Sequence, residues 1–369
     1  MKKNWKWNFY KRQNKRKAYK LFLRGLATKA KRKKRRIKLI GLKKSEKKIR
    51  VRHDIKHKDF VHVVAPANLS FVDNTVEVIK FINKLKLQYD HRKKVYVVLK
   101  KVTNLTFDAL VVLLSIMVKF KSNNIGFNGD LPADMVASNI LRRSGFLELL
   151  YQIYKPEDTY YLNRGSALFT HAALDVDPVL GQQIVSRASK AIWKDERRCQ
   201  GVQRAFLELM QNTNNHADIG KEGEKHWWLS VYHIPKENKV TFAFIDFGVG
   251  IFTSLDNKTA QSKFHNWLEK MGKIFSWKNN AELLKLILDG ELHKTATGKY
   301  YRGKGLPGLN QLMQRNQISN LHVITNNVKA NVNDNDYQVL SSNFGGTFIY
   351  WELNKNNVNC SGFNQNQGG

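Results

Sequence analysis

One stretch near the middle of the chain combines a carboxylate, an amide and an imidazole at a regular spacing. Glu208, Asn212 and His216 are four residues apart, so in a helix they form a tilted polar stripe on one side. Apolar residues within 202–210 recur at helical spacing and would bury the other side. A carboxylate in such a stripe could act as a general base. The alternative is an Asn-rich helix end that frays into a loop.

Three later stretches place glycine-rich turns beside strands and helices. Residues 242–251 read as a buried strand that ends at a carboxylate and runs into a turn. Residues 302–309 are a glycine-rich loop ahead of an amphipathic helix, and residues 344–353 are a glycine turn followed by an alternating strand. One such loop alone is common, but four stretches in this order are a more specific signal. Their distinctive residues are Asp246, Gly248, Gly250, Gly303, Lys304, Gly305, Leu306, Gly308 and Thr347.

Together these stretches resemble the ATP-binding domain of the histidine kinase-like (GHKL) ATPase family, which includes gyrase, histidine kinases and mismatch-repair ATPases. Glu208 and Asn212 match its E-x-x-x-N box, and residues 246–250 match its D-x-G-x-G box. Residues 303–306 match its second glycine box, and Thr347 follows the last glycine. The resemblance covers about residues 190–353. It implies an α/β sandwich that binds ATP and Mg²⁺.

The resemblance also implies a role for each of these residues. Asn212 would supply an oxygen to Mg²⁺, a hard ion that binds few protein oxygens and keeps several waters. Glu208 would orient or deprotonate the attacking water. Asp246 would accept a hydrogen bond from the adenine amino group. The remaining ATP-binding positions are His216 (whose alternative is a solvent-facing residue at a helix end), Gly248, Gly250, Gly303, Lys304, Gly305, Leu306, Gly308 and Thr347.

Length and composition indicate a soluble protein with packed cores. The 369 residues are 42% hydrophobic, enough for one very large domain or two ordinary ones. Cys199 and Cys360 provide neither a disulfide framework nor a metal-ligand spacing, which favours a reducing compartment. The longest apolar run, residues 109–118, is too short to span a bilayer, and no secretory signal is recognisable. We therefore expect a cytoplasmic protein without a membrane span.

Positive charge is concentrated in the first 50 residues. They hold 23 Lys or Arg and one acid, a net charge of +22, whereas the other 319 residues carry +11. A segment so charged cannot bury enough apolar surface to form a core, so we expect residues 1–52 to be a disordered arm. Phosphate contacts and base stacking would suit binding to RNA or DNA. A solubilising tail and a membrane-surface patch are the alternatives. The candidate contact residues are Trp5, Trp7, Lys31, Arg32, Lys33, Lys34, Arg35 and Arg36.

Residues 53–150 read as a separate α/β unit. Strands are expected at 60–64, 95–99 and 124–127, and helices at 74–87, 107–120 and 134–143. This alternation predicts a layered structure with some parallel pairing. The order, with the turn at 102–106 and Ser144–Phe146 at the end, resembles the STAS domain of sulfate transporters and anti-sigma-factor antagonists.

One departure from the regulatory STAS proteins bears on function. Those proteins carry a phosphorylatable serine ahead of the long helix, but residues 105–109 of this chain contain no serine. The unit is therefore expected to bind a protein partner, or to form a homodimer, without acting as a phosphoswitch. Residues 151–189 read as a linker with one strand at 159–162, residues 190–354 as the ATP-binding domain and residues 355–369 as a polar tail.

The resemblances leave three functions open. The first is an ATPase that hydrolyses ATP through Glu208 and changes its contacts with a protein or nucleic-acid partner. The second is a protein serine/threonine kinase of the anti-sigma-factor type. The third is a nucleotide-dependent scaffold that does not hydrolyse ATP. The presence of both Glu208 and Asn212 favours turnover over the third, and the lack of an acceptor serine counts against the second.

Deleting residues 1–50 is expected to abolish nucleic-acid binding. If the arm makes six or more phosphate contacts, the affinity of the full chain for RNA or DNA should fall about 10³-fold or more between 50 and 200 mM salt. Full-length protein and the deletion variant are titrated against labelled single-stranded RNA, duplex DNA and anionic vesicles. Equal nucleic-acid affinity of the two proteins contradicts the prediction, and a preference for vesicles indicates a membrane-surface tail.

Overall fold

The computed structural model describes most of the chain after residue 57. The described ranges are 58–150, 160–164, 167–172, 178–195, 199–216, 227–248, 250–252, 279–291 and 305–358, without the side chains of residues 148–149, 160–164, 167–172 and 212–216. Every helix and strand named below belongs to one compact unit that begins at residue 60. The predicted basic arm, with Trp5, Trp7 and residues 31–36, lies outside the described residues.

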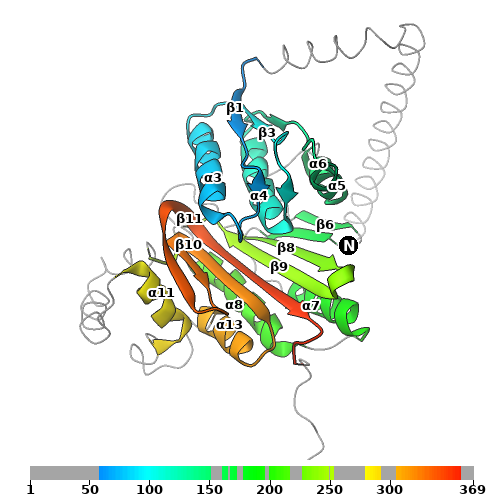
Figure 1. Cartoon of the computed structure of the whole chain (residues 1–369), viewed down its shortest axis with the longest axis vertical. Helices are drawn as coiled ribbons and strands as arrows, with labels where there is room; N and C mark the ends of the chain where they lie inside the picture. The colour runs from blue at the N-terminus through cyan, green and yellow to red at the C-terminus, as the bar shows by residue number, and fades with distance from the viewer. Residues whose placement is uncertain are drawn as a thin grey trace, which may run out of the picture. The chain divides into compact units, whose positions relative to one another are not determined.

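The first part of this unit, residues 60–150, is an α/β layer built on a small parallel sheet. Three strands pair in the order β1-β3-β5, and a second parallel pair joins β2 to β4. Its elements are β1 (Val61–Val64), β2 (Asn68–Leu69), α3 (Thr75–Asp90), β3 (Val95–Val98), β4 (Asn104–Leu105), α4 (Phe107–Ser122), β5 (Phe127–Gly129), α5 (Met135–Arg143) and α6 (Phe146–Leu150) (Figure 1). The predicted alternation and parallel pairing are confirmed.

Local sequence explains where the helices of this layer begin and how they pack. α4 is apolar around most of its circumference, and 12 of its 16 residues are buried, as expected for a helix enclosed on all sides. Asp134 caps α5 by accepting a hydrogen bond of 2.8 Å from the Ala137 amide. No helix within the described ranges is long and apolar enough to cross a membrane.

Strand β5 lies further along the chain than the sequence predicts. The expected strand at 124–127 is a turn at its start, because Asn124 has a left-handed φ of 56°. The chain then runs beside β3, where the Gly126 carbonyl accepts a hydrogen bond of 2.9 Å from the Val95 amide. Regular pairing begins only at Phe127, which lies opposite Val95. The apolar pattern identified the strand, and the turn at Asn124 moves the paired residues to 127–129.

The second part is a six-stranded antiparallel sheet whose own helices lie on one of its two faces. The strand order is β10-β11-β9-β8-β7-β6. The elements are β6 (Tyr160–Arg164), β7 (Ala167–Ala172), α7 (Pro178–Trp193), α8 (Gln200–His216), β8 (Trp227–Ile234), β9 (Lys239–Asp246), α11 (Asn280–Leu288), α13 (Gly305–Gln314), β10 (Ser319–Asn331) and β11 (Asp336–Asn354) (Figure 1). Mixed α/β structure, the predicted fold class, is confirmed.

The structure adds strands that the sequence analysis did not identify. The segment read as a linker contains two strands of the large sheet: β6, which confirms the strand expected at 159–162, and β7, which was not expected. β8 and β10 were also missed, and β9 and β11 begin earlier than expected. Long two-stranded hairpins connect β8 to β9 and β10 to β11, so the missed strands are the sequence neighbours of the recognised ones.

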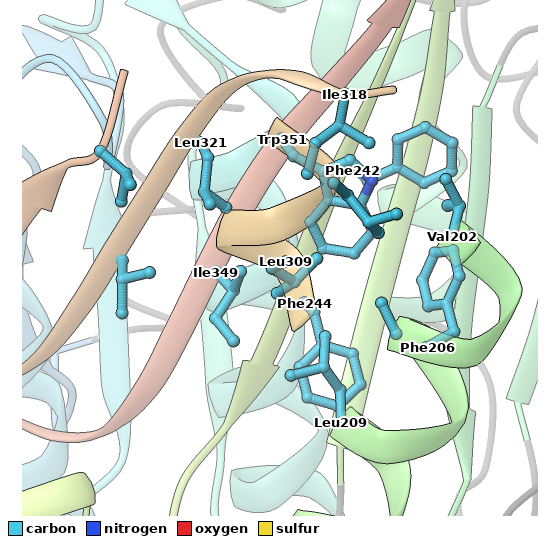
Figure 2. Packing of buried hydrophobic residues seen from close by; sticks show 14 of the residues in the cluster. Val202, Phe206, Leu209, Phe242, Phe244, Leu309, Ile318, Leu321, Ile349 and Trp351 are labelled. Atoms are coloured by element: carbon cyan, nitrogen blue, oxygen red, sulfur yellow. The ribbon is translucent and has the colours of Figure 1, made fainter. Parts of the chain in front are cut away.

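One face of the large sheet packs against helices α7, α8, α11 and α13. Phe206 of α8 lies 5.0 Å from the Trp351 ring of β11 and 5.7 Å from the Phe242 ring of β9, and those two strand rings stack 5.2 Å apart. Figure 2 shows these rings together with Leu309 of α13. The apolar side of the helix that carries Glu208 is therefore the side that anchors it to the sheet.

The opposite face of the same sheet is covered by α3 and α4 of the first layer. Its buried residues Ile245 and Phe348 belong to the same hydrophobic cluster as residues of α3, α4 and the loop after β2. Phe71, from that loop, is fully buried and meets Phe344 and Phe348 edge-on at 5.1 and 4.6 Å. The predicted domain boundaries at 150 and 189 thus fall inside one compact unit with a shared core.

Phe71→Ala is expected to destabilise residues 60–369 as a whole. Emptying this fully buried site should cost about 3–5 kcal/mol of unfolding free energy, the usual range for Phe→Ala in a core. Denaturant unfolding is followed by intrinsic fluorescence, with Leu87→Ala as the matched control, since Leu87 is an apolar residue of α3 that is half exposed. A loss for Phe71→Ala no larger than for Leu87→Ala contradicts a shared core.

Candidate functional site

Helix α8 presents Glu208 at the edge of its buried side. The Glu208 side chain is 22% exposed, and its Oε1 accepts a hydrogen bond of 3.1 Å from Nε of Arg204, one turn earlier. Its Oε2 is buried and has no hydrogen-bond partner within the described part of the chain. A buried carboxylate oxygen without a donor is costly, so this atom is available for a water or ligand group. The helix continues through residues 212–216, and the side chains of Asn212 and His216 lie outside the description.

Asp246 is the last residue of β9 and lies in a row across the sheet. It is paired with Trp227 of β8 and Thr347 of β11, and Thr347 is paired in turn with Thr325 of β10. Directly paired residues point to the same face of a sheet, and side chains alternate along each strand. Phe244, two residues before Asp246, belongs to the core under α8. The Asp246 carboxyl therefore faces the helix side of the sheet.

The turn after Asp246 is held by its own carboxylate and by strand β10. The Gly248 amide donates to Asp246 Oδ1 at 2.9 Å. The next amides, of Ile251 and Phe252, donate to Thr325 Oγ1 at 3.0 Å and to Asn326 Oδ1 at 3.2 Å. These side-chain contacts fix the turn as one conformation against the sheet.

Two glycines are required by this geometry. Gly250 has a φ of 79°, and a Cβ on it would collide with the Asn326 side chain. Gly346, beside Thr347 on β11, has a φ of 138°, and a Cβ there would collide with the Asp246 carbonyl oxygen. The D-x-G-x-G box and the last glycine box therefore meet at one point, where the two backbones approach closely.

The second glycine box lies at the start of α13. Gly305, Leu306 and Gly308 are in its first turn, and Gly303 and Lys304 lie outside the described residues. α13 packs against α8 closely enough that a Cβ on Gly201 would meet the Leu312 side chain. Asn310 joins α13 to the end of α11 through hydrogen bonds of 3.1 Å to the Leu288 carbonyl and to Asp289. The helices that carry two of the boxes are thus neighbours on one face of the sheet.

The electrostatics of Asp246 differ from those of a surface carboxylate. Burial raises its pKa from 3.8 to about 6, although the amides of Gly248 and Thr347, which favour the charged form, oppose the shift. At neutral pH the group is ionised at a cost to the fold. Carboxylates whose pKa is shifted by burial cluster at functional sites, where the cost is retained because the charge is used.

The structure brings part of the predicted site together directly. Asp246, Gly248, Gly250 and Thr347 form one cluster, and α8 and α13 cover the same face of the sheet. Sequence analysis missed the residues that fix this cluster from the neighbouring strand, Thr325 and Asn326. The sequence around them, an alternating run leading to several asparagines, gave a strand signal that could have been read.

The described residues include an acceptor suited to adenine, but they include no cluster of side chains that would hold a metal ion by itself. A partly buried acceptor, Asp246, beside a close-packed glycine turn suits the flat, donor-bearing edge of a base. The described residues contain no group of three or more His, Cys, Asp or Glu side chains placed to hold a metal ion. Mg²⁺ held by phosphates, waters and one protein amide requires no such group. The unpartnered Oε2 of Glu208 is the observation that suits a water near such an ion.

Comparison with known proteins adds no relative. No protein-family model, no curated protein sequence and no solved structure matches this chain. The likenesses to GHKL ATPases and to STAS domains therefore stay predictions, based on the motifs and on the geometry described above.

Asp246→Asn is expected to stabilise the nucleotide-free protein at neutral pH. A carboxyl whose pKa is raised on folding contributes stability that is complete below its unfolded pKa of 3.8 and is lost as the pH rises through about 6. The amide does not titrate and can still accept both backbone hydrogen bonds. The full shift corresponds to about 3 kcal/mol, and residual solvent contact reduces the expected gain at pH 7.5 to about 1–2 kcal/mol.

Thermal unfolding of both proteins between pH 4.5 and 7.5 measures this difference, which should shrink as the pH falls. Asp336→Asn, which removes an exposed carboxylate at the start of β11, is the control and should leave the pH dependence unchanged. A gain for Asp246→Asn that is equal at both pH values contradicts the assigned cause.

Proposed function

We propose that this chain binds ATP with Mg²⁺ at the face of its large sheet that α8 and α13 cover, in the manner of histidine kinase-like ATPases, and hydrolyses it. The observation that carries the proposal is the cluster at the end of β9. There a partly buried carboxylate, two glycines with positive φ and a threonine meet at the ends of β9 and β11. Two sequence boxes that are about 100 residues apart supply these groups, and no packing requirement of a core calls for a charge there.

Asp246 supports the adenine side of the site. An ionised carboxylate can only accept hydrogen bonds, so it selects a ring edge that donates. Adenine presents an amino group on that edge, whereas guanine presents a carbonyl oxygen. Thr347, paired with Asp246 and only 8% exposed, can add a hydroxyl contact to the same ligand edge. This pair is expected to favour ATP over GTP.

Glu208 and α13 support the phosphate side. α13 packs against α8, and a helix N-terminus directs free amide groups and partial positive charge towards an anion. Within the described residues, Glu208 keeps one oxygen without a hydrogen-bond partner, as a group that orients or deprotonates water requires. Asn212, one turn further along α8, would bind Mg²⁺, which supplies neutralising charge at the phosphates when bound.

The result of turnover is proposed to be a change in partner binding. The STAS-like layer would serve as the protein-binding part, and the basic arm as the nucleic-acid-binding part, of a cytoplasmic regulator. A protein serine/threonine kinase of the anti-sigma-factor type is the alternative. In that case the γ-phosphoryl group passes to a partner protein in place of water, and the same Glu208 and Mg²⁺ positions are used.

Wild-type protein is expected to bind ATP in a magnesium-dependent manner and to hydrolyse it. Glu208→Gln should retain binding and slow hydrolysis about 10²-fold or more, because an amide cannot act as the base. Asn212→Ala should lose the magnesium dependence of binding, and Asp246→Asn should reduce the preference for ATP over GTP. Calorimetric titration and a phosphate-release assay measure these effects. Glu237→Gln, a surface carboxylate 58% exposed, is the matched control.

Each outcome decides a specific point. An absence of ATP binding by the wild type under magnesium rejects the proposed function. Hydrolysis by Glu208→Gln at the rate of Glu237→Gln removes Glu208 from the reaction. Transfer of labelled phosphate from [γ-³²P]ATP to a partner protein, without phosphate release, replaces the ATPase by the kinase.

A further inference from the structure

Helix α3 of the first layer touches the proposed adenine side from the opposite face of the sheet. Its residue Lys86 is partly buried, and its Nζ donates a hydrogen bond of 2.9 Å to the Gly345 carbonyl. The same Nζ lies 4.9 Å from the ring centre of Phe247 and 5.2 Å from that of Phe344. Phe247 directly follows Asp246, and Gly345 directly precedes Gly346 and Thr347. One side chain of α3 therefore bridges the two glycine boxes.

The neighbours of Lys86 extend this contact along β11. Asn83, one turn earlier on α3, donates to the Asn343 carbonyl at 2.9 Å. Phe344 lies between Asn343 and Gly345 and packs against Phe71 and Phe247, with ring centres 5.1 and 6.0 Å apart. Segment 343–345 is thus held by two side-chain donors from the helix and by aromatic packing beneath it.

The contact acts on the site through the backbone. Gly346 approaches the Asp246 carbonyl so closely that no Cβ fits between them, so a shift of residues 343–346 must move Asp246 or Thr347. Phe247 sits on the other side of Asp246 in sequence and carries the cation–π contact with Lys86. A cation over an aromatic face contributes about 0.5–2 kcal/mol, depending on its exposure to water. Lys86 contacts both segments from the α3 side of the sheet, and the nucleotide is proposed to bind on the other side, under α8 and α13.

We propose that Lys86 is a positioning residue for the adenine side of the nucleotide site, and that ATP binding is therefore coupled to the packing of α3 against residues 246–248 and 343–347. This inference rests on the proposed function and adds its regulation. Coupling between two sites is reciprocal, so whatever displaces α3 weakens ATP binding, and ATP stabilises the α3 contact. A protein partner that binds the first layer could in this way control nucleotide occupancy.

The main test compares full-length Lys86→Met with Lys84→Met. Both variants lose one positive charge and keep an unbranched stem on α3, and Lys84 is exposed. Lys86→Met should weaken ATP binding by about 5-fold or more, the lower end of typical coupling, while Lys84→Met should match the wild type. Without nucleotide, amide hydrogen exchange of residues 246–248 and 343–347 should be faster in Lys86→Met only.

Two further measurements separate positioning from a general loss of stability. Lys86→Arg keeps the charge, the donor and the contact with aromatic faces, so it should restore most of the ATP affinity. ATP should slow hydrogen exchange of residues 83–87 in the wild type and in Lys84→Met, but not in Lys86→Met. Melting temperatures of the three variants are recorded alongside, and an affinity loss shared by all three in proportion to stability overturns the proposal.

Failure of this inference is distinguishable from failure of the proposed function. A wild type that binds no ATP rejects both. A wild type that binds ATP, with Lys86→Met binding as tightly as Lys84→Met, rejects only the coupling. Should Lys86→Met fold poorly, Asn83→Ala removes the neighbouring donor, and unchanged exchange and affinity in that variant would also reject it.

Discussion

The large sheet has two apolar faces, and the rest of the structure depends on covering both. In β9, Phe242 and Phe244 enter the core under α8, whereas Ala243 and Ile245 enter the core under α3 and α4. β11 alternates in the same way. A strand without a polar side cannot lie at a protein surface, so the sheet requires a layer of helices above and another below. Residues 60–150 supply the second layer, and the arrangement is a three-layer unit.

This enclosure explains why the candidate site lies at the end of β9. The buried run of the strand ends at Asp246, the first position where a polar side chain faces the helix layer. Amides of the turn that follows donate hydrogen bonds to Thr325 and Asn326 of β10, and the Phe247 ring at its start contacts Lys86 of α3. Rigid surroundings of this kind let a protein keep a partly buried carboxylate whose pKa is raised to about 6. The contacts that hold the end of β9 in the fold therefore also position the candidate site.

The sequence predicts the helices and strands better than it predicts which of them pack together. Periodicity located α3, α4 and α8, because one apolar stripe per helix is a local signal. The glycine-rich stretches located Asp246 and the glycines of the candidate site. It could not show that Phe71 packs on Phe344, because that contact joins residues far apart in sequence and either would suit any core. β7 was missed because its polar surroundings read as a linker, and Lys86 reads as an ordinary surface lysine.

The shared core also sets an order of events during synthesis. Asn83 meets Asn343 across 260 residues of chain, so the first layer leaves the ribosome long before its partner strand exists. At about 5–20 residues per second, the interval is roughly 10–50 s. Throughout that time, Phe71 lacks its β11 partners Phe344 and Phe348. The nascent chain thus exposes an aromatic side chain that a holding chaperone can bind, and β11, the last strand within the described residues, ends that exposure.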